Sequence, residues 1–182
     1  MSASEQSLAQ RWRSVALGKA GSQEKIDLAW ETGESKSTEF APELRRLLED
    51  DDEEVRYYTL QSLVLQLHEH DSDIQQVCWR LLETDDDDDV RSMAATCLGR
   101  IYSGSGDLRV FSRLVEVLKD QNQSGGVQRS AYEALFDLAG RPPREWPSLQ
   151  VSWRRLHEME IDWAKVAELE DSINANRSST SQ

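Results

Sequence analysis

Three pairs of apolar stretches follow one another along the chain, and a polar turn joins the two members of each pair. In every pair a leucine-rich stretch precedes the turn, and a valine opens a second apolar stretch after it. The valines are Val55, Val90 and Val127, which are 35 and 37 residues apart. Apolar positions three and four residues apart indicate helices, and a repeat of this length is typical of stacked helical hairpins.

Glycine and proline mark where two of the three predicted second helices end, and the apolar spacing alone marks the end of the other. We expect the second helices of the three pairs to stop near His68, at residues 104–106 and at residues 140–143. A glycine followed by prolines, as in the last of these segments, is a strong helix stop. No segment alternates between apolar and polar residues over a useful length, so we expect no sheet. The pattern predicts an all-α fold.

The ends of the chain follow this pattern less closely. Residues 1–38 are expected to form a degenerate helical hairpin or cap, with its two helices divided at residues 18–21. Residues 141–173 are expected to form tryptophan-rich capping helices that restart at Asp162, because the ends of a stacked array expose apolar surface. The tryptophans in this segment are Trp146, Trp153 and Trp163. Residues 174–182 are polar and predict a disordered tail.

The repeated order of Leu-Leu, Asp, Val-Arg and Ala-x(3)-Leu resembles HEAT repeats, in particular a short bacterial class also found in phycobilisome lyase subunits. The resemblance covers three repeats in roughly residues 39–140 and is good at the Ala-x(3)-Leu positions, whereas Tyr57-Tyr58 makes one helix bulkier. It implies a right-handed α-solenoid of about four to five hairpins, an architecture used mostly for binding. It also implies that Arg56, Arg91 and Arg129 pair with turn carboxylates in ladders between neighbouring repeats.

Charge is distributed unevenly. The chain has 38% hydrophobic residues, 30% charged residues and a net charge of −13, in the range of soluble globular proteins. Residues 39–89 contain 17 acidic and 4 basic residues, so this segment holds the whole net charge. Two acidic runs dominate it, at residues 49–54 and 85–89. Such a concentration predicts a negative surface patch.

Two interpretations of the acidic runs stay open. Carboxylates at a turn cap the following helix and complement its positive N-terminus, which would make the runs solvated caps. One or two acids suffice for a cap, however, and further like charges cost stability. If adjacent turns lie side by side, the runs would merge into one acidic ridge that binds a basic protein. The candidate partner-binding residues are Glu49, Asp50, Asp51, Asp52, Glu53, Glu54, Tyr57, Tyr58, Asp85, Asp86, Asp87, Asp88 and Asp89.

The sequence argues against several other kinds of site. The aspartate run lacks the alternating ligands, central glycine and distal glutamate of a calcium loop, and His68 and His70 are two rather than four residues apart. No nucleophile or phosphate-binding motif is present. We therefore expect neither an enzyme nor a metal or cofactor site. Clustered cations are also absent, which argues against direct nucleic-acid binding, and no apolar run reaches the length of a membrane span.

We therefore expect a non-enzymatic protein-binding module with a basic partner, and an immunity protein or inhibitor of a cationic toxin, such as a nuclease, fits its size and charge. The alternatives are a scaffold or adaptor subunit of a larger assembly, or a chromophore-lyase or chaperone-like subunit. An exposed aromatic residue beside the acids would serve as an anchor; Tyr57, Tyr58, Trp79 and Tyr102 are candidates. Cys78 and Cys97 are expected to be free and buried, and the chain starts without a secretory signal. These features predict a cytoplasmic protein, monomeric when free.

Overall fold

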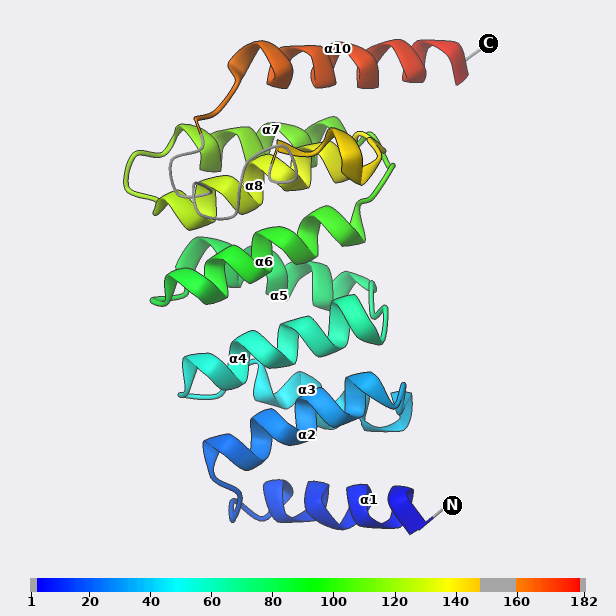
Figure 1. Cartoon of the computed structure of the whole chain (residues 1–182), viewed down its shortest axis with the longest axis vertical. Helices are drawn as coiled ribbons and strands as arrows, with labels where there is room; N and C mark the ends of the chain where they lie inside the picture. Colours follow the sequence, from blue (N-terminus) through cyan, green and yellow to red (C-terminus); the bar gives the residue numbers. More distant parts are fainter. Residues whose placement is uncertain (1–2, 148–159, 181–182) are drawn as a thin grey trace. The chain divides into compact units, whose positions relative to one another are not determined.

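The computed structural model describes residues 3–147 and 160–180, and every regular element within them is a helix (Figure 1). The helices divide into two units, residues 1–77 and residues 78–182, and the division falls within helix α5 (Ser72–Thr84). The first unit contains α1 (Ala3–Ala16), α2 (Ser22–Glu34), the 3-10 helix η1 (Thr38–Phe40), α3 (Ala41–Leu47), α4 (Glu53–Leu60) and the π-helix η2 (Gln61–Gln66). The second contains α6 (Asp88–Ile101), α7 (Leu108–Lys119), α8 (Gly125–Leu138), η3 (Pro143–Glu145) and α10 (Trp163–Thr180).

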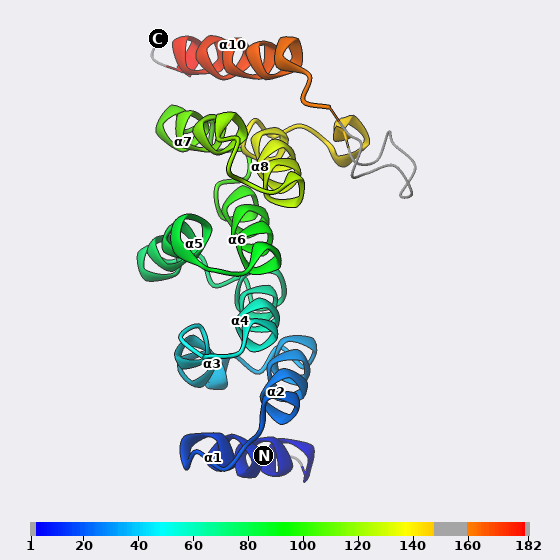
Figure 2. The same ribbon diagram turned by 90° about the vertical axis from the view of Figure 1, so that its left-hand side faces the viewer.

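Within each unit the second helices of successive hairpins pack against one another. In the first unit α2 packs along α4 and η2, with α3 in the other layer (Figure 2). In the second unit α6 packs along α8, with α7 in the other layer. This two-layer arrangement of hairpins confirms the predicted all-α solenoid, and no strand occurs in the part of the chain that the structure describes.

The N-terminal segment forms two helices, α1 and α2. Trp12 of α1 is buried, and its indole Nε1 donates a hydrogen bond to the Thr32 hydroxyl of α2 over 3.1 Å. Its ring also stacks on Phe40, with centroids 6.2 Å apart. Gly18, in the loop between α1 and α2, has a φ of +68°. The buried hydrogen bond therefore joins the two helices of the hairpin, the aromatic contact joins α1 to Phe40 at the start of the next repeat, and α2 packs along α4.

A close approach joins α6 and α8 in the second unit. A Cβ atom on Gly99 of α6 would lie 2.8 Å from the Ala134 Cα of α8, well inside van der Waals contact. The absence of a side chain at Gly99 and the small side chain of Ala134 therefore let the two backbones meet. Cys78 and Cys97 are both free and buried, as predicted. Burial raises the pKa of the Cys97 thiol well above its ordinary value, so this thiol is unreactive near neutral pH.

The C-terminal segment differs from the expectation in two respects. Helix α10 continues to Thr180, through most of the segment for which the sequence predicted a disordered tail. It is anchored by Val166, Leu169 and Ile173, all of them buried. These apolar residues are spaced three and four residues apart, as in a helix. The polar residues after Ile173 continue the same helix. Trp163, predicted to cover apolar surface, is instead 46% exposed. Helix α10 begins directly after Asp162, as predicted, whereas Trp153 lies outside the described residues.

Candidate functional site

The acidic run of the first unit contains two aspartates that build the turn before α4. The Asp52 carboxylate caps α4 by accepting the Glu54 backbone N–H over 3.0 Å. A hydrogen bond from the Ser22 hydroxyl lowers the pKa of Asp52 below its ordinary value. Asp50 accepts the Asp52 backbone N–H over 3.3 Å and forms an ion pair with Lys25 at 2.6 Å. Asp50 and Asp52 are therefore structural.

The turn before α6 in the second unit is built in the same way. Asp87 caps α6 by accepting the backbone N–H groups of Asp89 and Val90, both over 3.0 Å. Asp85 accepts the Asp87 backbone N–H over 3.0 Å. The turn before α8 repeats the plan without the acidic run: its cap is a serine, Ser124, which accepts the Val127 backbone N–H. Two aspartates of each acidic run thus bond to the backbone of the turns before α4 and α6.

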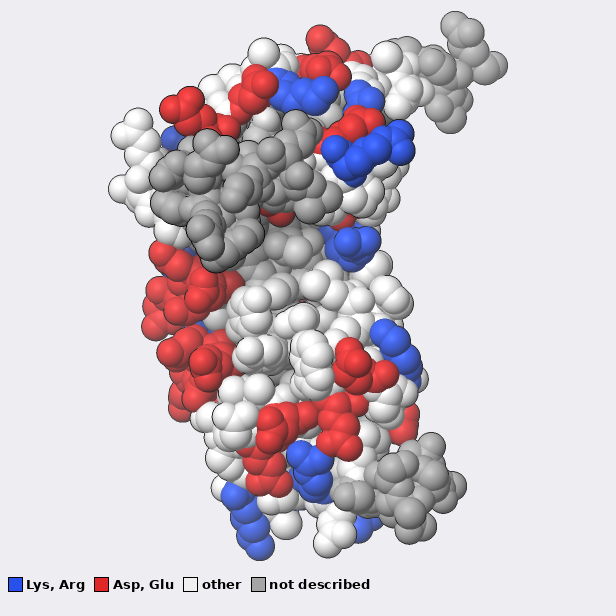
Figure 3. Space-filling model, in the orientation of Figure 1, with Lys and Arg blue, Asp and Glu red and all other residues white. Residues whose placement is uncertain are grey.

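The remaining acids of both runs are exposed. In the first unit these are Glu49, Asp51, Glu53 and Glu54. In the second unit they are Asp86, Asp88 and Asp89, of which Asp88 forms an ion pair with Arg91. Figure 3 shows dense carboxylate clusters beside the start of α4 and beside the start of α6. Each run therefore contains aspartates that cap the following helix and further carboxylates that are exposed, and a role of the exposed acids in binding stays a prediction.

The side chain directly after each valine bonds to the backbone of its own turn. Arg56 donates from Nη1 to the carbonyl oxygens of Asp50 and Asp51, at 2.8 and 3.2 Å, and Arg91 donates to that of Asp85 at 2.7 Å. In the third repeat the corresponding residue is Gln128, whose amide donates to the Asp120 carbonyl at 3.1 Å.

The assignment of this position to Arg129 is therefore corrected. The third repeat reads Val-Gln-Arg, and the residue directly after Val127 is the one that faces the turn. The Arg129 side chain makes no hydrogen bond or ion pair with the residues whose side chains are described. Ladders between neighbouring repeats, and a single ridge formed by both acidic runs, stay predictions because the two runs belong to different units.

The aromatic candidates differ in exposure. Tyr57 and Tyr58 are both partly exposed, and their rings meet edge to face at a centroid distance of 5.2 Å. Tyr102 is also partly exposed, whereas Trp79 is only 9% exposed. Trp30 of α2 was not among the predicted aromatic candidates, yet it is 43% exposed. Its signal was its helical position: it lies three residues after Asp27 and four before Glu34, on the polar side of α2.

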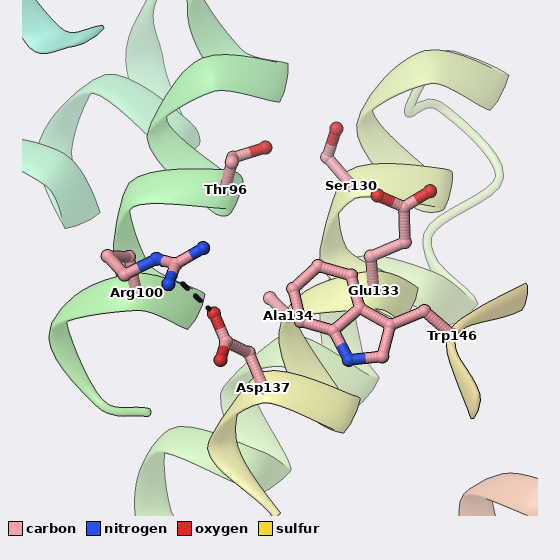
Figure 4. Close-up of a pocket in the computed structure, with 7 residues that line it drawn as sticks. All are labelled: Thr96, Arg100, Ser130, Glu133, Ala134, Asp137 and Trp146. Atoms are coloured by element: carbon pink, nitrogen blue, oxygen red, sulfur yellow. Dashed lines mark ion pairs between the residues drawn. The ribbon is translucent and has the colours of Figure 1, made fainter. Parts of the chain in front are cut away.

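The second unit has a pocket between α6 and α8, closed on one side by Trp146 (Figure 4). Arg100 points toward Asp137 at its base, with Nε and Oδ2 3.8 Å apart, and Asp137 also accepts the Ser103 hydroxyl over 2.7 Å. The Trp146 indole N–H donates to the Arg141 carbonyl over 2.9 Å. The cavity volume of about 30 Å³ corresponds to one or two water molecules. The pocket is a polar contact between helices, too small for a chromophore.

The described residues contain neither a cluster of metal ligands nor a membrane-spanning helix. No group of three or more histidine, cysteine or acidic side chains there could hold a metal ion. Among the described helices, none has the length and apolar character to cross a bilayer. Asp71, just before α5, forms an ion pair with Arg45. The hydrogen bond from Arg45 lowers the pKa of Asp71 to about 2.

Comparison with known proteins agrees with this architecture. The family model that describes HEAT repeats matches residues 41–136, which is more than half of the chain. A search of curated proteins found no match. The matched residues run from the start of α3 to near the end of α8 and include all three inter-helix turns described above. The chain belongs to the HEAT-repeat family.

Proposed function

We propose that this chain is a non-enzymatic protein-binding module that engages a basic protein through the exposed acids of its inter-helix turns. HEAT repeats generally mediate protein–protein interaction, and members of the family are typically non-catalytic. The observation that carries the proposal is the excess of exposed carboxylates at two turns over the two side chains that each turn uses. Their repulsion costs stability, and a cationic partner would offset that cost.

The exposed acids would attract a cationic partner before contact. A dense cluster of one sign attracts an oppositely charged partner over roughly a Debye length, about 8 Å at physiological salt, and speeds the encounter. The partly exposed rings of Tyr57 and Tyr58 follow the first cluster on α4 and offer short-range contact area. A surface of clustered carboxylates also resembles the phosphates of nucleic acid in charge. An inhibitor or immunity protein that occupies a cationic toxin, such as a nuclease, is therefore the specific role we propose.

The test compares capture of partners by two variants with equal charge. The turn variant carries Asp51→Asn, Glu53→Gln, Glu54→Gln and Asp89→Asn, which leaves the structural residues Asp50, Asp52, Asp85 and Asp87 in place. The control variant neutralises four exposed acids elsewhere, namely Glu39, Glu160, Glu170 and Asp171. Capture from native lysate at about 50 and 500 mM salt, followed by mass spectrometry, identifies the partner.

We expect the wild type and the control to capture one basic protein at low salt. The turn variant should lose it, with an association rate at least about tenfold lower for the purified pair. Equal capture by all three proteins, or capture that does not change with salt, would contradict the proposal and leave the acids as solvated caps. A chromophore-lyase function gains no support from the pocket between α6 and α8, because of its small volume.

A further inference from the structure

The second unit contains a tryptophan whose ring binds a cation of the same chain. Trp79 and Glu83 lie one turn apart on α5, and Arg113 of α7 sits over the Trp79 ring, with its guanidinium carbon 3.8 Å from the ring centroid. The same guanidinium forms an ion pair with Glu83. A planar guanidinium can stack on an indole and pair with a carboxylate at once. Trp79 and Glu83, four residues apart on α5, therefore form a binding site for an arginine side chain.

The same spacing recurs on α2 of the first unit, where the ring is open to solvent. Trp30 precedes Glu34 by four residues and follows Asp27 by three, so that the three side chains share the exposed side of α2. Trp30 is 43% exposed. Trp163, the other tryptophan of similar exposure, has Lys119 6.0 Å from its ring centroid. Among the residues whose side chains are described, none places a cation over Trp30.

Of the three acidic residues near Trp30 on α2, one pairs with a cation and two accept hydrogen bonds from neutral side chains. Glu31 forms an ion pair with Arg11 of α1. Glu34 accepts a hydrogen bond from the Gln66 amide over 2.9 Å, and Asp27 accepts one from the Gln23 amide over 2.9 Å. Both donors are neutral amides, so these hydrogen bonds bring no positive charge to Glu34 or Asp27. An exposed indole with carboxylates three residues before it and four residues after it on one helix is complementary to a cationic side chain.

We propose that Trp30 and Glu34 bind an arginine side chain of the basic partner, in the manner in which Trp79 and Glu83 bind Arg113. The proposal rests on the proposed function for the basic character of the partner. Arginine fits better than lysine, because a guanidinium can stack on the ring while it pairs with the carboxylate. Asp27 adds attraction from the other side of the ring.

The position of Trp30 relates this site to the acidic turn of the same unit. Lys25 pairs with Asp50, and Ser22 donates to Asp52, so the start of α2 lies beside the turn. Trp30 follows Ser22 by eight residues, which is about 12 Å along a helix. An extended partner segment covers that distance in about four residues. The partner is thus expected to present an arginine about four residues from the cations that face the turn.

The test uses two peptides, nine arginines and nine lysines, with the full chain at about 50 mM salt. Binding is measured by calorimetry and by the NMR signal of the Trp30 indole N–H, assigned with a Trp30→Phe variant. The variants are Trp30→Ala, Glu34→Gln, the first-unit turn variant with Asp51→Asn, Glu53→Gln and Glu54→Gln, and Trp163→Ala as the control for an exposed tryptophan. Circular dichroism verifies that each variant is folded.

We expect the arginine peptide to shift the Trp30 indole signal and to bind more tightly than the lysine peptide. Trp30→Ala should weaken arginine-peptide binding about three- to fivefold and abolish the preference for arginine. Glu34→Gln should weaken it to a smaller extent, and Trp163→Ala should have no effect.

The outcomes separate this inference from the proposed function. Unchanged binding by Trp30→Ala with an unmoved Trp30 signal overturns the inference, and the turn acids can still account for binding. The expected weakening in Trp30→Ala together with full binding in the turn variant supports the inference and overturns the role of the turns. Failure of both peptides to bind the wild type at low salt overturns both.

Discussion

At the residue scale, the ends of the second helices share one backbone feature. Lys36, His68, Gly104 and Gly140 follow α2, η2, α6 and α8, and their φ angles are +56°, +60°, +68° and +67°. A residue with positive φ commonly ends a helix, and glycine adopts this conformation without strain. Lys36 and His68 are not glycines, so a positive φ strains the backbone at these two residues. Lys36 has a compensation, because its Nζ donates to the Gln66 carbonyl over 2.6 Å.

His68 is the position where relief of this strain is measurable. Its side chain is exposed and meets only the edge of the His70 ring, with centroids 6.1 Å apart. His68→Gly is expected to raise the free energy of unfolding by about 1 kcal/mol, because left-handed backbone costs a non-glycine residue about this much. Urea denaturation measures the change. The matched control, Lys36→Gly, should gain less because it loses the hydrogen bond to Gln66, and an equal gain for both would contradict the account.

Sequence reasoning succeeded for residues whose role depends on their immediate neighbours. The prediction that aspartates at the turns cap the next helix is confirmed at Asp52 and Asp87, because a cap bonds to backbone N–H groups two or three residues away. Arg129 shows the limit of this reasoning. The arginine matched the expected residue type, but the backbone places Gln128 against the turn instead.

At the element scale, the contact between α6 and α8 depends on the absence of a side chain at one position. Gly99→Ala is expected to lower the free energy of unfolding by about 1–3 kcal/mol, because the added methyl group would push against the backbone of Ala134. The matched control is Gly125→Ala at the start of α8, where an added Cβ meets nothing within 4 Å. Chemical denaturation of both variants checks the prediction. A Gly99→Ala variant as stable as the control would mean that the helices separate at little cost.

Element boundaries were predictable where glycine or proline marked them. The predicted stops at residues 104–106 and 140–143 are confirmed by the ends of α6 and α8, and the stop near His68, which no glycine or proline marks, is confirmed by the end of η2. The π-helix η2 had no such signal, since a π-helical turn depends on packing rather than on a signature residue. The continuation of α10 to Thr180 was missed for a related reason: a polar sequence gives no apolar spacing, yet a helix anchored at Ile173 can extend beyond its buried part.

At the scale of the whole molecule, the net charge of −13 arises from residues 39–89 and acts against folding. Repulsion between like charges destabilises a folded chain, and salt screens it. The free energy of unfolding is therefore expected to rise as sodium chloride increases from about 20 to 200 mM. Thermal denaturation measures this rise. The turn variant should show a smaller rise than the wild type, and a stability that falls with added salt would contradict the account.

The sequence by itself determined the helical repeat, the position of the turns and the concentration of acid at two of them. These features depend on residue spacing and on bonds within a few residues of the chain, which a single sequence displays directly. The tertiary structure decided which acids are used by the turns and which remain exposed, that Gln128 replaces an arginine, and that Arg113 covers Trp79 while no described side chain covers Trp30 with a cation. The last of those outcomes depends on packing between helices far apart in sequence, where a tryptophan faces either a neighbouring helix or solvent, whereas the first two depend on the local backbone geometry of each turn.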